Sequence, residues 1–412
     1  MFNKFSLVLI SSCLIFSYYS QSKKILFLGN SYTYYNSLPQ LISDVALSFG
    51  DSINWDSNTP GGYTFQGHST NSVSLSKISM GIWDHVILQE QSQLPSFPPS
   101  QVATDCFPYA SILIDSIRAG NICTEPVFFM TWGRENGDQS NCANYPPVCT
   151  YDGMQGRLRE SYLQMSVDNQ CTVSPVGAVW KYVRDNHPSI GLYSSDGSHP
   201  SIYGSYLAAC VHYSTIFRKS AVGSTFMSTL GHSDAVSLQQ AAALVVLDSL
   251  ENWSIGANDV IADFTYQSNG TLVDFNFTGQ QEDSVFWDFG NGLSSNNINP
   301  THDFQNSGAF IVTLIASNSC EADTTSQTLT LSSLNITDYS LQVSMIQSDN
   351  IIILNFDNFN QRTISLTDIQ GKLLYHNNSN AQYIELNIPR NIICFISIHE
   401  GEKSKVFKLI CQ

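Results

Sequence analysis

A serine, an aspartate and a histidine stand in settings suited to nucleophilic catalysis. Ser31 follows the continuously apolar run 25–28, and Asp196 precedes His199 by three residues in a loop that contains a glycine and a proline. An aspartate in this position can orient the imidazole and stabilise it while it takes a proton from a serine hydroxyl. Ser31 alone could be a turn residue, and a loop histidine alone could be a surface residue or a metal ligand. The two features together favour a Ser31–His199–Asp196 triad.

Alternating strands and helices between residues 22 and 256 are expected to position these three groups. Residues 25–28, 86–88 and 127–130 are continuously apolar, as in strands that are buried on both faces of a parallel sheet. Helical spacing of apolar residues predicts helices over 38–49, 111–118, 155–165, 202–217 and 238–250. The pattern predicts a doubly wound α/β domain. In such a domain ligands bind at the carboxyl ends of the strands, where Ser31 would lie.

The chain changes character after Trp253. Short alternating stretches such as 273–277 and 310–314, separated by glycine and asparagine turns, predict a small β-sandwich over residues 260–333. A second strand-rich unit follows over residues 334–412, without a convincing helix. Its candidate strands are 363–366, 372–375 and 395–398. A length of 412 residues agrees with two or three domains.

The composition excludes several classes of partner. The formal net charge is −16 and only 13% of the residues are charged. The chain therefore lacks a basic patch that would release counterions from nucleic-acid phosphates. Anionic lipid surfaces would repel the same charge. A neutral or cationic partner remains open, and a surface rich in Ser, Asn and Thr suits an extracellular protein.

The first 20 residues have the pattern of a secretory signal peptide. Lys4 precedes the apolar run 5–16, and the polar segment 17–21 follows, with cleavage expected near Ser20. Lipoprotein processing at Cys13 is the alternative, although the apolar run before it would be short. The run is too short to span a bilayer, and no later segment is long and apolar enough for a membrane helix. The mature protein is therefore expected to be secreted or attached to the cell surface.

Cysteine usage agrees with export. Apart from Cys13, six cysteines fall in the α/β region and three toward the end, and none has the C-x-x-C spacing of a zinc or redox site. In an oxidising compartment disulfides are expected, and Cys142–Cys149 is the easiest pair because its loop is short. This pair would staple the proline-containing loop 136–150. The sequence leaves the connectivity of the other cysteines open.

We expect neither a cofactor nor a metal. The histidines outside the proposed triad show no spacing typical of metal ligands, and the chain has no glycine-rich phosphate-binding loop. These histidines include His68, His85, His187, His212 and His232. Trp132 and Trp180 are interpreted as core or rim residues rather than as part of a cofactor site.

The segments around the proposed triad resemble the sequence blocks of the SGNH (GDSL-like) hydrolases. Segment 29–32 (Gly-Asn-Ser-Tyr) is similar to the first block, and segment 196–200 (Asp-Gly-Ser-His-Pro) is similar to the last. The resemblance covers residues 22–220. It implies a three-layer α/β/α sandwich in which the triad named above is catalytic.

Two middle blocks of the family supply an oxyanion hole, and only one of them is easily matched here. Segment 60–63 (Pro-Gly-Gly-Tyr) is the expected second block, in which Gly62 would donate its backbone N–H. The third block departs from the usual Gly-x-Asn-Asp, because segment 89–92 reads Gln-Glu-Gln-Ser. A glutamine side chain offers the same N–H donor as asparagine. Gln89 is therefore the expected oxyanion donor, with Gln91 as the alternative.

The second unit resembles a polycystic-kidney-disease-type (PKD) domain. Segment 286–292 is similar to the W-D-F-G-D-G signature of these domains, with Asn291 in place of the usual aspartate. Segments 300–304 and 308–314 complete the pattern. The resemblance implies an Ig-like sandwich that serves as a spacer or a binding platform.

The third unit resembles, more weakly, the C-terminal sorting domain of type IX secretion cargo. Segment 364–372 and a late strand over 405–409 carry this resemblance, whereas the usual Gly-Tyr turn is replaced at 391–394. The resemblance implies a partner in the export machinery. It also implies a Bacteroidetes-type host that exports the protein across its outer membrane.

Ester hydrolysis is the leading hypothesis. Ser31 would attack the carbonyl carbon, His199 would act as base and then as acid, and Asp196 would hold His199. The expected substrate is a small-molecule or polysaccharide ester, with an O-acyl group on a carbohydrate as one candidate. The rival hypothesis is a non-catalytic surface binding protein in which the β modules bind the partner.

Overall fold

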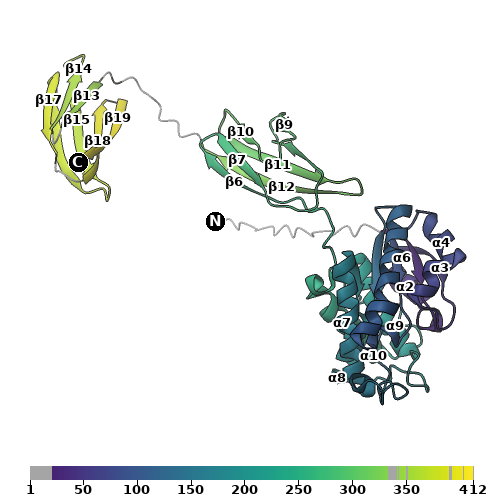
Figure 1. Ribbon diagram of the computed structural model, residues 1–412. Helices are drawn as coiled ribbons and strands as arrows, with labels where there is room; N and C mark the ends of the chain where they lie inside the picture. Colours follow the sequence, from purple (N-terminus) through teal and green to yellow (C-terminus); the bar gives the residue numbers. More distant parts are fainter. Residues whose placement is uncertain are drawn as a thin grey trace, which may run out of the picture.

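The computed structural model describes residues 21–332, 341, 343–348, 351–388, 392–401 and 403–411. The expected signal peptide and Cys13 lie outside the described residues. Figure 1 shows a helix-rich domain, a β-sandwich and a further β unit in chain order. Among the described residues, no helix combines the length and the apolar character that a bilayer span needs.

Five parallel strands form the sheet of the first domain, in the order β2-β1-β3-β4-β5. They are β1 (Ser22–Leu28), β2 (Ser52–Asn58), β3 (His85–Leu88), β4 (Glu125–Phe129) and β5 (Thr172–Ser174). The chain goes from β1 to the edge strand β2 and then to β3 on the other side of β1. Because the winding direction reverses there, the loops after β1 and β3 diverge and leave room for a ligand at the carboxyl edge. The α/β fold class predicted from the sequence is confirmed.

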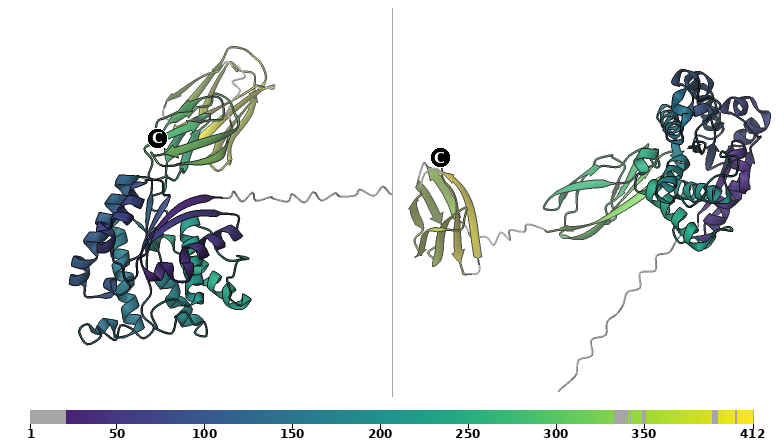
Figure 2. Two further views of the ribbon diagram at one scale, coloured as in Figure 1. Left: turned by 90° about the vertical axis from the view of Figure 1, so that its right-hand side faces the viewer. Right: turned by 90° about the horizontal axis from the view of Figure 1, so that it is seen from below.

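Helices cover both faces of this sheet, as Figure 2 shows. They are α1 (Ser31–Tyr34), α2 (Leu38–Ser48), α3 (Phe65–Thr70), α4 (Ser72–Ser79), α5 (Pro99–Asp105), α6 (Phe107–Gly120), α7 (Tyr151–Asn169), α8 (Val176–Asn186), α9 (Ile202–Phe217) and α10 (His232–Leu247). The helix predicted over 238–250 starts earlier than expected and ends at Leu247. Leu250 belongs instead to the short 3-10 turn Leu250–Trp253.

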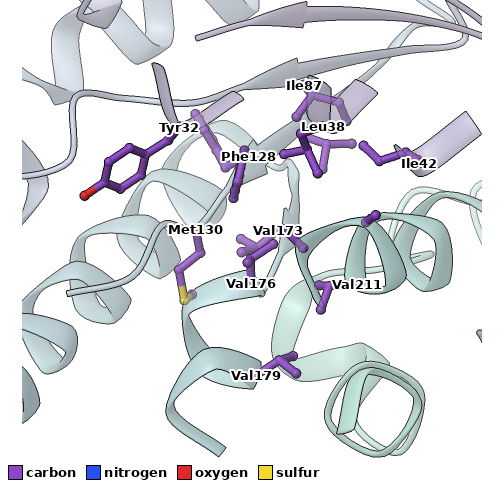
Figure 3. Close-up of a cluster of buried hydrophobic side chains, with 14 of the residues drawn as sticks. Tyr32, Leu38, Ile42, Ile87, Phe128, Met130, Val173, Val176, Val179 and Val211 are labelled. Atoms are coloured by element: carbon purple, nitrogen blue, oxygen red, sulfur yellow. The ribbon is translucent and has the colours of Figure 1, made fainter. Parts of the chain in front are cut away.

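The core of the first domain explains the apolar strands. Figure 3 shows side chains of α2, α8 and α9 meeting Ile87, Phe128 and Val173 of the sheet. These strand residues are at most 1% exposed. Because helices lie over both faces, a strand such as β3 has no solvent side that would favour a polar residue.

The second unit is a sandwich of two antiparallel sheets, in the orders β10-β7-β6 and β12-β11-β8-β9. Its strands are β6 (Phe264–Asn269), β7 (Leu272–Phe277), β8 (Ser284–Asp288), β9 (Ser294–Ser295), β10 (Thr301–Asp303), β11 (Gly308–Ser317) and β12 (Ala322–Leu331). Inward side chains alternate along the strands and surround the fully buried Trp287. This alternation is the pattern that predicts a sandwich from the sequence.

A disulfide joins the β-sandwich to the first domain. Cys123, just before β4, is bonded to Cys320 in the turn between β11 and β12, with 5.1 Å between the Cα atoms. In the connecting segment, Asp259 forms an ion pair with Arg218 of the first domain. Since the strands are parallel, the amino end of β4 lies at the edge of the sheet opposite to the edge where Ser31 follows β1. The sandwich is therefore attached at the side away from Ser31.

The third unit also consists of two antiparallel sheets, in the orders β13-β14-β17 and β16-β15-β18-β19. Its strands are β13 (Val343–Ser348), β14 (Ile351–Phe356), β15 (Arg362–Asp368), β16 (Leu373–Ser379), β17 (Tyr383–Asn387), β18 (Ile392–Glu400) and β19 (Lys403–Cys411). A separate apolar core, which includes Leu354, Leu366 and Ile396, lies between the sheets. The all-β character expected for this unit is confirmed.

Candidate active site

Ser31 lies at the start of a short helix directly after β1. Asn30 caps this helix, because its Oδ1 accepts a hydrogen bond from Tyr32 N at 3.2 Å. The preceding turn is tight, since a Cβ at Gly29 would stand 2.7 Å from Gln89 Oε1. These contacts hold the Ser31 side chain at the carboxyl edge of the sheet, where the sequence predicts the nucleophile.

Ser31, His199 and Asp196 are brought together although 168 residues separate the first two. His199 Nε2 lies 2.9 Å from Ser31 Oγ, and His199 Nδ1 lies 2.5 Å from Asp196 Oδ2. The carboxylate accepts from Nδ1–H, so Nε2 is left to accept the serine proton. Burial opposes ionisation of Asp196, but hydrogen bonds from the His199 ring and from the backbone N–H groups of Ser198 and His199 hold its pKa below the ordinary value.

Aromatic stacking supports the loop that carries His199. Tyr32 stacks on Trp132 with 4.6 Å between ring centroids, and Trp132 stacks on Trp180 at 4.0 Å. The loop is bonded to this stack at Ser198, whose carbonyl accepts from Trp132 Nε1 at 3.0 Å and whose hydroxyl lies 2.7 Å from Tyr32 Oη. Both tryptophans are fully buried, so of the two positions considered for them, core and rim, they occupy the core.

His68 supports the nucleophile from behind, a role that sequence reasoning missed. Its Nε2 donates to the carbonyl of Gly29 at 2.9 Å, so Nδ1 accepts from the Ser74 hydroxyl at 2.8 Å. Burial lowers the pKa of His68 to about 4, so the ring is neutral at physiological pH. The sequence signal was weak, because His68 stands alone in a polar segment without a recognisable spacing to the triad.

The second block forms a turn that is bonded to the nucleophile loop. Tyr63 N donates to the carbonyl of Pro60 at 3.2 Å, and Gly62 has a φ of +69°, which glycine adopts without strain. Asn30 Nδ2 donates to the carbonyl of Tyr63 at 2.9 Å. The turn follows β2, which pairs with β1. Gly62 therefore lies at the same sheet edge as Ser31, as expected.

The structure corrects the expectation that Gln89 is the oxyanion donor. Its side chain is fully buried, and Nε2 donates to Asn30 Oδ1 and to the carbonyl of Glu90. Its Oε1 accepts from Asn30 N and from Thr33 Oγ1, both at 2.9 Å. Each amide hydrogen therefore already has an acceptor. Gln89 instead holds the nucleophile loop in place.

Gln91 has the free N–H that Gln89 lacks. Its Oε1 accepts from the backbone N–H groups of Gln93 at 2.8 Å and Leu94 at 3.1 Å, which fixes the orientation of the amide. Its Nε2 donates one hydrogen to Gln93 Oε1 at 3.2 Å, and the other has no acceptor among the described residues. Ser31 and Gln91 each lie three residues past the paired Leu28 and Leu88.

A disulfide-stapled loop lies beside the third block. The predicted Cys142–Cys149 disulfide is present, with 4.6 Å between the Cα atoms. Within this loop Asp138 is fully buried and accepts from Gln93 Nε2 at 2.6 Å and from Arg134 Nη1 at 3.2 Å. The stapled loop therefore anchors Gln93, which in turn contacts Gln91.

His68 and His85 are among the histidines that we expect not to bind a metal. His85 Nε2 lies 3.2 Å from Glu125 Oε2. In the part of the chain that the structure describes, no three or more His, Cys, Asp or Glu side chains are grouped as metal ligands would be.

Comparison with protein families matches one part of the chain. Residues 260–332 match the family model described as PKD domain, which confirms the resemblance of the second unit. Comparison with curated proteins found no match for the chain.

The first domain is similar in fold to solved structures that include a proposed SGNH hydrolase and an esterase. A DUF4886 family protein from Bacteroides uniformis is 15% identical, with a TM-score of 0.47 over 56% of this chain and 95% of that protein. A protein from Slackia heliotrinireducens, proposed to be an SGNH hydrolase, is 26% identical, with a TM-score of 0.39 over 48% and 100%. The esterase EstA from Pseudoalteromonas sp. is 16% identical, with a TM-score of 0.34 over 48% and 97%.

Proposed function

We propose that the first domain is a serine esterase. The observation that carries this proposal is the Ser31–His199–Asp196 arrangement, with both hydrogen bonds formed at the carboxyl edge of a doubly wound sheet. Ser31 Oγ attacks the ester carbonyl carbon while His199 Nε2 takes its proton, and the protonated ring then gives that proton to the leaving alcohol. Water repeats these steps on the acyl-enzyme and releases the acid.

Three N–H groups are our candidates for the oxyanion hole. The backbone N–H groups of Ser31 and Gly62 have no acceptor among the described residues, and Gln91 has one spare amide hydrogen. All three follow the carboxyl ends of adjacent strands, β1, β2 and β3. Such donors stabilise the charge that develops on the carbonyl oxygen more than they stabilise the substrate.

The substrate that this site would suit is an ester on a larger carrier, such as an O-acyl group on a carbohydrate. The side chains of Asp196 and His199 are 48% and 28% exposed, so the triad lies near the surface and a bulky carrier can approach it. Disulfides Cys123–Cys320 and Cys142–Cys149 support export to an oxidising compartment. Outer-membrane export through the third unit is part of the same proposal.

A fluorophosphonate probe tests the proposal, because it labels an activated serine covalently. The full chain should be labelled and should hydrolyse small esters, whereas Ser31→Ala should lose both properties. Ser79→Ala is the control, since it removes an exposed serine hydroxyl at the end of α4, bonded to the carbonyl of Ser76, and should keep the label. An unlabelled, folded wild-type chain would instead favour the non-catalytic binding protein.

A further inference from the structure

Glu90 is a buried carboxyl group at the end of β3, between two loops of the candidate site. Its side chain is fully buried. No lysine, arginine or histidine of the described chain lies within ion-pair distance of it. A carboxylate buried without a cation is costly, and burial raises the pKa of Glu90 to about 8. An apolar side chain could fill the same space without this cost.

The two oxygens of Glu90 each accept from a different loop. Oε2 accepts from Phe65 N at 2.9 Å, and Oε1 accepts from Gln91 N at 2.5 Å. Phe65 is the first residue of α3 and follows the turn that carries Gly62. One carboxyl group therefore connects the second block to the third block.

Two backbone N–H groups donate to the Glu90 side chain. The position therefore suits a group that has two acceptor atoms and no N–H of its own. The titratable neighbours of Glu90 are Cys106 and Tyr162 of α7. Cys106 Sγ lies 3.9 Å from Glu90 Oε2. Burial raises the pKa of both neighbours. The Cys106 thiol can donate to Oε2 while both Glu90 oxygens still face the N–H groups. An amide would instead turn its NH₂ group toward one of those N–H donors.

We propose that Glu90 is a positioning residue that fixes the spacing between the two oxyanion-hole loops, and so between Gly62 and Gln91. This inference rests on the proposed esterase function. Glu90 contacts neither Ser31 nor His199 in the described structure, so it acts through the two backbone groups that it holds. A displacement of about 1 Å in a catalytic group can cost on the order of 10² in rate, so a small change in this spacing should be measurable.

Glu90→Gln is the sharpest test, because it keeps the volume of the side chain and removes one of the two acceptors. We expect kcat for a small ester to fall by about 10- to 100-fold, with a much smaller change in KM. The rate of fluorophosphonate labelling of Ser31 should fall with kcat. Glu90→Asp keeps the carboxyl group but is one methylene shorter, so it also cannot reach both N–H groups and should show the same loss of kcat.

Glu125→Gln is the control, since Glu125 is a partly buried carboxylate that also accepts hydrogen bonds but lies at the opposite, amino end of β4. Its hydrogen bonds with His85 and Thr172 hold its pKa near 2 in spite of burial. This variant should lose thermal stability and keep its kcat. A folded Glu90→Gln or Glu90→Asp protein with the wild-type kcat overturns the inference, whatever its melting temperature. Failure of the esterase proposal is distinguished from this result, because the wild-type chain would then show neither turnover nor labelling.

Discussion

At the scale of single residues, two glutamines with the same chemistry have different roles because of their partners. Gln89 uses both amide hydrogens and its oxygen inside the protein, whereas Gln91 has its oxygen fixed by two backbone N–H groups and keeps one hydrogen spare. An amide that is held in one orientation and still has a free N–H can bind an oxyanion without reorganising. We therefore propose that Gln91, the alternative expected from the sequence, is the oxyanion donor of the third block.

Gln91→Ala should lower kcat by about 10²–10³, because one preorganised oxyanion donor is removed. KM and the melting temperature should change much less, since the Gln91 side chain is only partly buried. Steady-state kinetics with a chromogenic ester and a thermal melt measure these quantities together.

Gln89→Ala is the comparison for that experiment. It leaves Asn30 N and Thr33 Oγ1 buried without their acceptor, so we expect a loss of about 1–3 kcal/mol in the free energy of unfolding. Its kcat should fall less than that of Gln91→Ala. The opposite ranking of the two kcat values would return the donor role to Gln89.

At the scale of elements, the position of His199 depends on how α9 packs against α8. Gly204, in the first turn of α9, lies so close to α8 that a Cβ would stand 2.4 Å from the Trp180 ring and 2.4 Å from the carbonyl of Leu192. Trp180 also belongs to the stack under the catalytic loop. The absence of a side chain at Gly204 therefore allows α9 to lie close to the aromatic stack that supports the His199 loop.

Gly204→Ala should destabilise the protein by about 1–3 kcal/mol, because the added methyl overpacks this contact. We also expect a lower kcat, since α9 must shift relative to Trp180. Gly156→Ala is the control, because a Cβ at Gly156 of α7 would meet no atom within 4 Å. That variant should be more stable by about 0.5–1 kcal/mol, owing to the helix preference of alanine. Chemical denaturation measures both values, and equal stabilities for the two variants would refute this account of the α8–α9 contact.

At the scale of the whole molecule, the proposed catalytic groups and the β-sandwich lie at opposite edges of one sheet. Cys123 ties the sandwich to the amino end of β4, while Ser31 follows the carboxyl end of β1. The first domain also has an apolar core of its own, separate from that of the sandwich. The sandwich is thus in a position to act as a spacer and does not line the triad.

A chain that ends at Gly256 and carries Cys123→Ser should fold and hydrolyse small esters with a kcat close to that of the full chain. The substitution removes the thiol that would otherwise lose its disulfide partner. Circular dichroism melting and ester turnover test this expectation. A truncated protein that unfolds cooperatively but has lost turnover would show that the β units contribute to the site.

The sequence by itself determined the class of the fold and predicted the three residues of the proposed triad. Continuous apolar runs such as 25–28 occur where a strand is covered on both faces, so they reveal a parallel sheet without knowledge of its partners. Ser31 and the pair Asp196–His199 were found for a similar reason. Each stands at a strand end or in a rigid loop whose local chemistry is readable from a few neighbours.

Other elements could not be predicted, because their local sequence patterns are weak. Strand β5 has only three residues, and β2 is a half-exposed edge strand that reads as a mixed polar segment. Neither has the apolar run that marks the inner strands. The Cys123–Cys320 disulfide could not be predicted either, because the two cysteines are 197 residues apart and belong to different domains.

Only the tertiary structure decided which polar side chains are available for chemistry. Gln89 and Gln91 have the same functional group and nearly the same local sequence. Gln89 forms hydrogen bonds with the Asn30 loop, 59 residues away in the chain, so its amide N–H group already has an acceptor there. His68 and Glu90 likewise acquire their roles from backbone groups of distant loops, Gly29 and Phe65. A hydrogen bond to a distant backbone atom leaves no signature in the residue types around either partner, so folding alone assigns it.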